Sequence, residues 1–473
     1  MPIFSRFKTL AVFIAFITAF SMAACTTSGG RSKPWDYKAP QAQAQEAPSP
    51  LAGNYGNKSA SRNIMVDSTT AATTGGPVTS PEIQRLPLEA QNANPAMANT
   101  PPAAAPGATI KVALLLPLSG ENKKLGQSML KAAQMALFDI GYNGIELLPK
   151  DTKGTPDGAQ NAAQQALDSG AQLILGPVFS PEVRAAKNVT QRAGVNMISF
   201  STDWSLAGSN TYVMGFLPFD QVERIATYAQ RQGMQHIGVL APTSDYGNAV
   251  VNAYRSLAAN TGMNPAAVEQ FLPGNADLDA TVRKFSRYDA RAGSSVAGSP
   301  IAPPPFDAVL LPVGGDMARA ASNSLSQYGL PASNVKRLGT GLWDDQMLAA
   351  EPGLNGAWFA APSPRARASF EERYTALYKA SAPRLSTLAY DATALAVILG
   401  RSGQQQMGRP AFDHAAITNP NGFAGIDGIF RFRSNGIAER GLAVLELRGG
   451  RPVVIDDAPR TFQQSGLEQY SRY

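Results

Sequence analysis

Apolar and polar residues follow a regular block pattern from residue 110 onwards. A continuous apolar run, IKVALLLPL, occupies residues 110–118 and is typical of a strand covered on both faces. The next segment has apolar residues at helical spacing, so that Met129, Ala133 and Ile140 share one face of the predicted helix. Strand and helix then alternate, which predicts βαβ units and a parallel sheet. The remaining predicted elements of this half are 145–151, 158–168, 171–179, 181–193 and 196–201.

The alternation of strands and helices starts again after residue 212. Two halves of about 100 residues are predicted, with later segments returning to complete both. The expected fold class is therefore α/β, with two lobes that each contain a parallel sheet flanked by helices. Residues 293–305 and 401–411 interrupt the pattern and are interpreted as surface insertions. The predicted elements of the second half are 220–232, 236–247, 248–261, 268–274, 306–315, 316–328 and 336–341.

Residues 1–24 have the three parts of a secretory signal peptide. Arg6 and Lys8 precede TLAVFIAFITAF, which is shorter than the roughly 20 apolar residues that a spanning helix needs. Small residues follow and end at Cys25, and the letters MAAC resemble the lipobox of bacterial lipoproteins. The resemblance implies cleavage before Cys25, acylation of that residue and, because Thr26 rather than aspartate follows it, sorting to the outer membrane. The alternative is an ordinary signal peptide with an incidental cysteine.

The segment from Cys25 to residue 108 is rich in proline and alanine, and its only aromatic residues are Trp35, Tyr37 and Tyr55. Such a composition buries too little apolar surface to offset the entropy of ordering the chain. We interpret this segment as a disordered tether behind the lipid anchor. A small domain without a periodic pattern is the alternative.

Charge and metal-binding residues exclude several classes of function. The net charge of +6 is spread thinly, since residues 109–473 hold 33 basic and 30 acidic side chains, so nucleic-acid binding is not expected. One cysteine cannot form an intrachain disulfide, and with His236 and His414 it does not make a structural zinc site. No Ser stands in a G-x-S-x-G motif. We expect no enzyme activity, no metal and no cofactor, with His236 structural and His414 exposed in an insertion.

Several stretches, in this order, resemble the type I periplasmic binding proteins, in the branch that includes Leu/Ile/Val-binding proteins. They are VALLLPLSG (112–120), GPVFS (176–180), ISFSTD (198–203), APTSDYG (241–247) and GFAGIDGIFRFRSNG (422–436). The resemblance implies one two-lobed domain over 109–457, followed by a tail at 458–473. Arg431 and Arg433 in the last stretch are expected to alternate outward on a strand, or to contact a glycan or partner.

Within that superfamily, the lipobox, the tether, GTGLWDD (339–345) and GAWFAAP (356–362) look most like the penicillin-binding-protein activators. This resemblance implies an outer-membrane lipoprotein that binds and stimulates a peptidoglycan synthase. The enterobacterial activators carry a helical-repeat domain where this chain has the tether, so the contact surface stays open. The alternative function is a lipid-anchored receptor for an amino acid or similar solute, serving an ABC transporter.

Ligands of open parallel sheets lie beyond the carboxyl ends of the strands, which predicts a cleft between the lobes. The candidate cleft residues are Ser119, Ser180, Ser201, Thr202, Asp203, Tyr246, Gly314 and Trp343. By resemblance, Ser180 and the Ser201–Thr202 pair would hold a ligand carboxylate; the alternative is that they cap helices. Gly341 stands where amino-acid binders have a glutamate for the ligand ammonium, and Asp203, Asp316 and Asp344 are the possible substitutes. Trp343 could stack on a ligand or fill the cleft.

Overall fold

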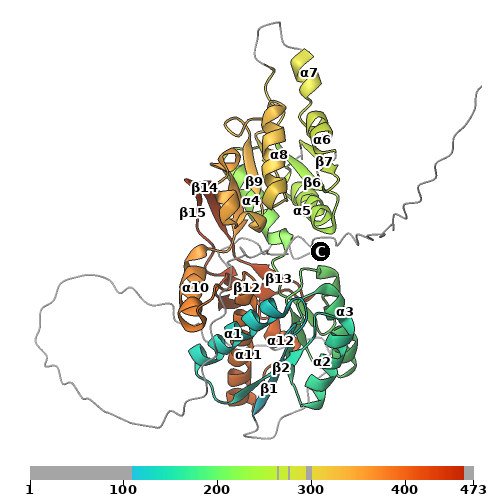
Figure 1. Cartoon of the computed structure of the whole chain (residues 1–473), viewed down its shortest axis with the longest axis vertical. Helices are drawn as coiled ribbons and strands as arrows, with labels where there is room; N and C mark the ends of the chain where they lie inside the picture. The colour runs from blue at the N-terminus through green and yellow to red at the C-terminus, as the bar shows by residue number, and fades with distance from the viewer. Residues whose placement is uncertain (1–108, 264–265, 275–276, 294–300, 463–473) are drawn as a thin grey trace, which may run out of the picture. The chain divides into compact units, whose positions relative to one another are not determined.

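Figure 1 shows the computed structural model, which describes residues 109–462 apart from 264–265, 275–276 and 294–300. The predicted signal peptide, Cys25 and the tether lie outside the described residues, as does most of the predicted tail. The described residues form two α/β lobes, as the block pattern predicts.

The first lobe contains a five-stranded sheet in the order β2-β1-β3-β4-β5, and all its strands run parallel. Ala113 and Leu115 of β1 pack with α2 and α3, whereas Ile110 lies against α11 at Gly400. Helices therefore cover both faces of the sheet, which explains why the β1 sequence is continuously apolar. The elements of this part are β1 (Ile110–Leu116), α1 (Lys123–Ile140), β2 (Ile145–Asp151), α2 (Pro156–Asp168), β3 (Leu173–Leu175), α3 (Ser180–Arg192), β4 (Met197–Ser199) and β5 (Thr211–Val213).

Local signals set the ends of these helices. α2 begins after Thr155, whose Oγ1 accepts a hydrogen bond from the backbone N–H of Gly158 at 3.1 Å, and Pro156 occupies the first turn. α1 ends at Gly141, which has a φ of +63°, a conformation that favours glycine.

The second lobe contains a seven-stranded sheet in the order β15-β14-β10-β9-β8-β6-β7. The strands from β10 to β7 in this order run parallel to one another. β14 is antiparallel to both β10 and β15, so the sheet is mixed. α4 packs with α5, and α6 packs with α8. The elements are α4 (Pro218–Arg231), β6 (Ile237–Pro242), α5 (Asp245–Thr261), β7 (Ala267–Phe271), α6 (Leu278–Phe285), α7 (Tyr288–Gly293), β8 (Ala308–Leu310), α8 (Gly315–Gln327), β9 (Lys336–Gly339), α9 (Gln346–Ala349) and β10 (Trp358–Ala361).

The chain passes between the lobes three times, near Phe216, between β10 and α10 (Pro364–Tyr378), and after Arg440. α10 packs on α1 of the first lobe, where the Tyr374 hydroxyl donates to the Ser128 backbone oxygen at 3.3 Å. After the second passage it completes the first lobe with α11 (Ser386–Met407), α12 (His414–Ile417) and a small antiparallel sheet of β11 (Phe423–Gly425), β12 (Gly428–Phe432) and β13 (Ala438–Arg440). After the third it completes the second lobe with β14 (Ala443–Arg448) and β15 (Arg451–Asp456). Both lobes are thus assembled from segments far apart in the sequence.

Two predictions for the C-terminal half are wrong. Residues 401–411 are not a surface insertion, because α11 continues to Met407 and the backbone oxygen of the buried Phe412 accepts a hydrogen bond from Asn196 at 2.6 Å. The polar residues in this stretch lie on the outer face of α11, so the sequence there lacks the apolar spacing that predicts a helix. His414 is not an exposed loop residue: it begins α12, and its Nδ1 lies 2.8 Å from the Tyr212 hydroxyl.

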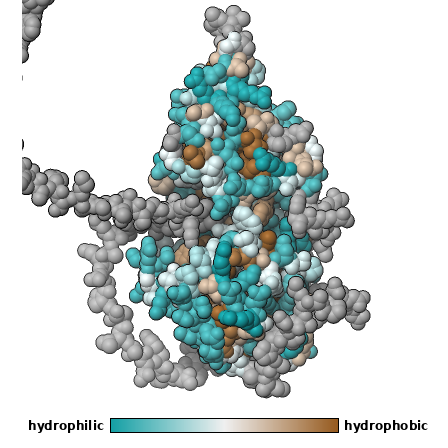
Figure 2. Space-filling model, turned by 90° about the vertical axis from the view of Figure 1, so that its right-hand side faces the viewer, coloured by the Kyte–Doolittle hydropathy of each residue, from teal (hydrophilic) through white to brown (hydrophobic). Residues whose placement is uncertain are grey.

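The largest core described belongs to the second lobe and joins its sheet to α6, α8 and the segment after β9. Trp343 is fully buried in it, and its ring lies directly over Gly339, where a Cβ would come within 2.2 Å of the indole. Figure 2 shows a mainly hydrophilic face with separate apolar spots. Among the described residues, no helix combines the length and the apolar character needed to cross a membrane.

Candidate functional site

Ser119 lies just after β1 and is held by Asp151 at the end of β2. Its hydroxyl donates to Asp151 Oδ2 at 2.6 Å, and its backbone N–H donates to Oδ1 at 3.1 Å. Oδ1 also accepts from the backbone N–H groups of Leu118 and Lys153. Burial alone would raise the pKa of Asp151, but these hydrogen bonds outweigh it and keep the pKa below its ordinary value. The Ser119 hydroxyl therefore donates its proton to Asp151 within the protein.

Ser180, Ser201 and Asp203 come together beyond the carboxyl ends of β3 and β4. Ser180 is the first residue of α3, and its Oγ lies 3.1 Å from Ser201 Oγ. Ser201 is 3% exposed and accepts the Asp203 backbone N–H at 3.0 Å. Phe179 precedes α3 and supplies no side-chain cap to it. A helix start beside a pair of hydroxyls is a favourable environment for an anion.

Asp203 and Thr202 have local partners as well. Asp203 Oδ1 accepts from the backbone N–H of Ser205 at 3.1 Å and so caps the short 3₁₀ turn Trp204–Leu206. Its other oxygen lies 3.5 Å from the largely exposed Arg184. Thr202 is partly buried, and a Cβ on Gly215 would lie 3.0 Å from its methyl group. Asp203 thus acts as a cap, although it is still partly open to solvent.

In the second lobe, Tyr246 points inward rather than outward. Its hydroxyl donates to Thr340 Oγ1 at 2.9 Å, it is almost completely buried, and burial raises its pKa. Gly314 directly precedes α8, and a Cβ there would lie 3.3 Å from Leu342. Trp343 donates from Nε1 to the Val313 backbone oxygen at 2.7 Å. The predicted stacking surface at Trp343 is therefore not accessible in this structure, because the indole belongs to the core.

The acids that could pair with a ligand ammonium have other partners. The backbone N–H of Gly341 donates to Gln221 Oε1 at 2.7 Å, so a neutral amide lies at the position to which the resemblance assigns the glutamate of amino-acid binders. Asp344 is 8% exposed and is engaged by Arg367 and Arg384. Asp316 is 91% exposed and pairs with Arg319. A buried cation without an acid is costly, so this region does not suit an amino-acid ammonium group.

Sequence reasoning missed a cluster of buried charges at the three passages between the lobes. At its centre, two guanidinium groups lie over the Phe216 ring, with Arg384 at 4.1 Å and Arg440 at 5.0 Å from the ring centroid. These three residues come from three separate segments of the chain. Arg440 also donates to the backbone oxygen of Met214 at 2.9 Å. Cation–π contacts are strongest when the cation is removed from water, as it is here.

Arg384 connects the two lobes through two carboxylates. Its guanidinium lies 2.8 Å from Asp427 of the first lobe and 3.7 Å from Asp344 of the second. Asp427 is fully buried and also accepts from the Thr387 hydroxyl at 2.6 Å. Burial alone would raise the pKa of Asp427, but the charge of Arg384 outweighs it and holds the pKa below its ordinary value. Removal of Arg384 would leave the fully buried Asp427 without its ion-pair partner.

Asp391 lies beside this pair on α11. It is buried, accepts the Ile426 backbone N–H at 2.7 Å, and has a second oxygen without a hydrogen bond among the described residues. Burial, together with the neighbouring charge of Asp427, raises the pKa of Asp391. An acid inside the apolar run TLAYDATALAV was the one sequence signal for this cluster.

Arg431 and Arg433 do not project freely from a strand, in contrast to the expectation. Both donate to Glu439 Oε2, at 2.9 and 3.1 Å, and Arg433 also lies 3.7 Å from Asp220. Asp220, whose side chain is 13% exposed, accepts the Arg440 backbone N–H at 2.8 Å. Burial raises its pKa to about 7 against the opposing charge of Arg433. These arginines therefore extend the charge cluster rather than form an open basic surface.

The described residues contain no group of three or more His, Cys, Asp or Glu side chains placed to hold a metal ion.

Comparison with known proteins identifies the fold. A family model described as "Periplasmic binding protein" matches residues 109–451. A crystal structure of a proposed branched-chain amino acid ABC transporter from Rhodospirillum rubrum has a TM-score of 0.64 and 20% sequence identity, and the match covers 73% of this chain and all of that one. At that identity the likeness concerns the fold alone.

Two kinds of curated relative match parts of the chain. One is "Penicillin-binding protein activator LpoA" of Glaesserella parasuis, 30% identical over 144 residues, which are 30% of this chain and 24% of that protein. The other is "Leucine-, isoleucine-, valine-, threonine-, and alanine-binding protein" of Pseudomonas aeruginosa, 25% identical over 190 residues, which are 38% of this chain and 51% of that protein. The chain thus spans about a quarter of the first relative and about half of the second.

Proposed function

Because this chain belongs to the periplasmic binding protein family, we propose that it uses the two-lobed fold to bind and activate a penicillin-binding protein, and so regulates peptidoglycan synthesis. It would act from the periplasmic face of the outer membrane, held there by acyl chains on Cys25. The curated activators of Glaesserella parasuis and Pectobacterium parmentieri support this choice. Two acyl chains or more anchor a protein stably, whereas one does so only marginally.

The observation that carries the proposal is that the second-lobe positions which the resemblance assigns to a ligand are occupied by other contacts. Gly341 bonds to the neutral Gln221, and Asp344 is already engaged by two arginines. Trp343 and Tyr246 are turned into the core of the second lobe. A solute receptor would need these positions for its ligand, whereas a protein regulator does not. We therefore favour a binding partner that is a protein.

The test combines binding with activity. The mature lipidated chain would be purified from membranes in detergent and mixed with the bifunctional penicillin-binding protein of the same bacterium. We expect a saturable complex by surface plasmon resonance and faster glycan-chain synthesis from lipid II. Unfolded chain is the matched control. A folded chain that neither binds the synthase nor changes its rate would show that the proposal is wrong.

The anchor has a separate test. Replacement of Cys25 by Ala should move the protein from the outer-membrane fraction to the periplasmic fraction, because acylation needs the thiol. A variant that stays in the outer-membrane fraction would contradict lipid anchoring without touching the proposed activity.

A second candidate function is reception of an amino acid or a similar solute for an ABC transporter. The Ser180–Ser201 hydroxyl pair beside the start of α3 favours it, since such a group suits a carboxylate. Titration calorimetry with the twenty amino acids distinguishes the two functions. We expect no saturable heat; micromolar binding of one amino acid would favour the receptor.

A further inference from the structure

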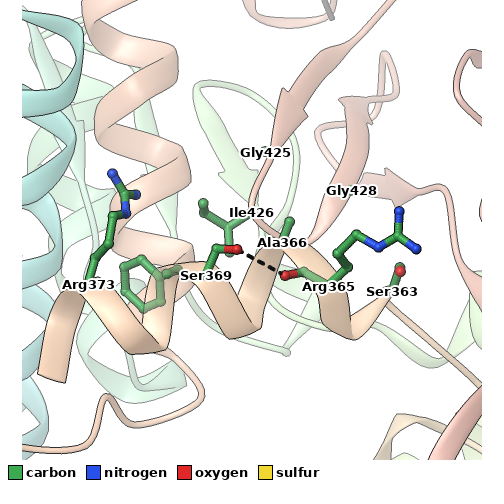
Figure 3. Close-up of a pocket in the computed structure, with 9 residues that line it drawn as sticks. Ser363, Arg365, Ala366, Ser369, Arg373, Gly425, Ile426 and Gly428 are labelled. Carbon is green, nitrogen blue, oxygen red and sulfur yellow. Dashed lines mark hydrogen bonds between the residues drawn. The ribbon is translucent and has the colours of Figure 1, made fainter. Parts of the chain in front are cut away.

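A groove lies between α10 and the turn that joins β11 to β12. Its volume is about 580 Å³. Figure 3 shows α10 running along the groove with Ile426 facing it. The helix contributes residues at spacings of about one turn, and the turn contributes the opposite wall. The lining residues are Ser363, Arg365, Ala366, Ser369, Phe370, Arg373, Gly425, Ile426 and Gly428.

The turn that forms the opposite wall has glycine at positions 425 and 428, so no side chains project from these positions into the groove. A Cβ on Gly425 would lie 2.4 Å from Asp391 Oδ2, so no side chain fits at that position. Gly428 has a φ of +85°, which other residues rarely adopt. The turn itself is rigid, since Ile426 donates its backbone N–H to Asp391 and Asp427 is held by Arg384. The groove is therefore preorganised rather than a gap between loose loops.

The floor is apolar and the two ends are cationic. Phe370 is a buried member of the cluster that packs α10 on α1, and the partly buried Ile426 packs against that cluster. Arg365 and Arg373 flank the groove eight residues apart on α10, a separation of about 12 Å along the helix. Arg373 shares its charge with Asp139 at 2.8 Å, whereas the exposed Arg365 has no ion pair within the described part of the chain. Arg367 between them turns toward Asp344 instead.

These features fit one kind of occupant. Guanidinium groups bind carboxylates in a planar, two-pronged arrangement, and arginine is enriched where proteins recognise other proteins. About 12 Å corresponds to roughly four residues of extended chain. We propose that this groove binds an extended segment of a partner protein in which apolar residues lie between two carboxylates about four positions apart. The inference rests on the proposed function, because the partner would be the penicillin-binding protein.

Charge reversal in the full mature chain tests the groove. Arg365→Glu and Arg373→Glu should each weaken binding of the purified penicillin-binding protein about tenfold, since each removes an attraction and adds a repulsion. Arg255→Glu is the matched control, because Arg255 is an exposed arginine on α5. Ser369→Trp should also weaken binding by filling the groove without a change in charge, with the exposed Ser333→Trp as its control. Thermal unfolding of each variant confirms that it is folded.

The outcomes separate this inference from the proposed function. If the wild-type chain binds the synthase and the groove variants bind as well as their controls, the groove is not the docking site and the proposed function stands. If the wild-type chain does not bind the synthase, the proposed function fails and the inference fails with it. Independently of these variants, a photo-crosslinking amino acid at position 369 of the otherwise wild-type chain identifies the segment that occupies the groove. A crosslink to an acidic segment of the synthase supports the inference, whereas a crosslink to residues 26–108 of the same chain overturns it.

Discussion

The strand ends of the two lobes and the passages between the lobes use polar side chains in opposite ways. At the strand ends many contacts use neutral hydroxyls, as in the Ser180–Ser201 and Tyr246–Thr340 pairs, and the Asp151 carboxylate there is held by a hydroxyl and backbone N–H groups rather than by a cation. At the passages they join full charges that are largely withdrawn from water, with Arg384, Asp427 and Arg440 around the ring of Phe216. The two regions lie within one fold but differ in how far a single substitution would lower the free energy of unfolding.

This difference indicates where the chain can change and where it cannot. A neutral hydrogen bond contributes about 1 kcal/mol, and either partner can be replaced at that scale of cost. A buried ion that loses its partner costs several times more. A single substitution at the strand ends should therefore cost little, whereas removal of one member of the charge network at the passages should cost several times more.

The largest expected effect comes from Arg384→Ala. It removes the cation that Asp427 needs and one face of the Phe216 contact, so we expect the free energy of unfolding to fall by about 3–5 kcal/mol. Guanidinium denaturation at pH 7 followed by circular dichroism measures it. Arg255→Ala should change stability by less than about 0.5 kcal/mol. If Arg384→Ala lowered the free energy of unfolding no more than the control does, the charges at the passages would not be more important for stability than the contacts at the strand ends.

Asp220→Asn should have an intermediate effect that depends on pH. The pKa of Asp220 is raised from 3.8 to about 7 in the folded chain, so the folded state takes up a proton that the unfolded state lacks. The stability this provides is complete below about pH 4 and is lost as the pH rises through 7. The variant should therefore gain about 2–3 kcal/mol relative to the wild type between pH 5 and pH 8.

Thermal and denaturant unfolding at several pH values would reveal this gain. The exposed Asp316→Asn is the control, and its difference from the wild type should be nearly constant with pH. A difference for Asp220→Asn that shrinks with rising pH would mean that Arg433 keeps Asp220 ionised.

Tyr246→Phe should have the smallest effect, about 1 kcal/mol, because it removes one neutral hydrogen bond and keeps the ring in the core. A double-mutant cycle with Thr340→Val isolates the contact between the two hydroxyls. Coupling well above about 1 kcal/mol would show that this strand end is as constrained as the passages.

The sequence alone predicted the α/β class, the two lobes and the parallel strands, because each of these depends on local periodicity. β2 coincides with its predicted range, 145–151, and the predicted helix 181–193 lies within one residue of α3. It also placed Ser180 and Ser201 beyond the carboxyl ends of strands, and the structure adds that their hydroxyl oxygens lie 3.1 Å apart. Where polar residues cover a buried helix, as at 401–411, the same local signal failed.

Only the tertiary structure decided which charges meet. Phe216, Arg384 and Arg440 come from three segments far apart in the chain, and the two arginines look like surface residues in their own sequence context. The structure likewise turned Trp343 into the core, because Gly339 leaves room for the indole. Such contacts depend on long-range packing, in which a residue's neighbours are set by the whole fold rather than by its position in a helix or strand.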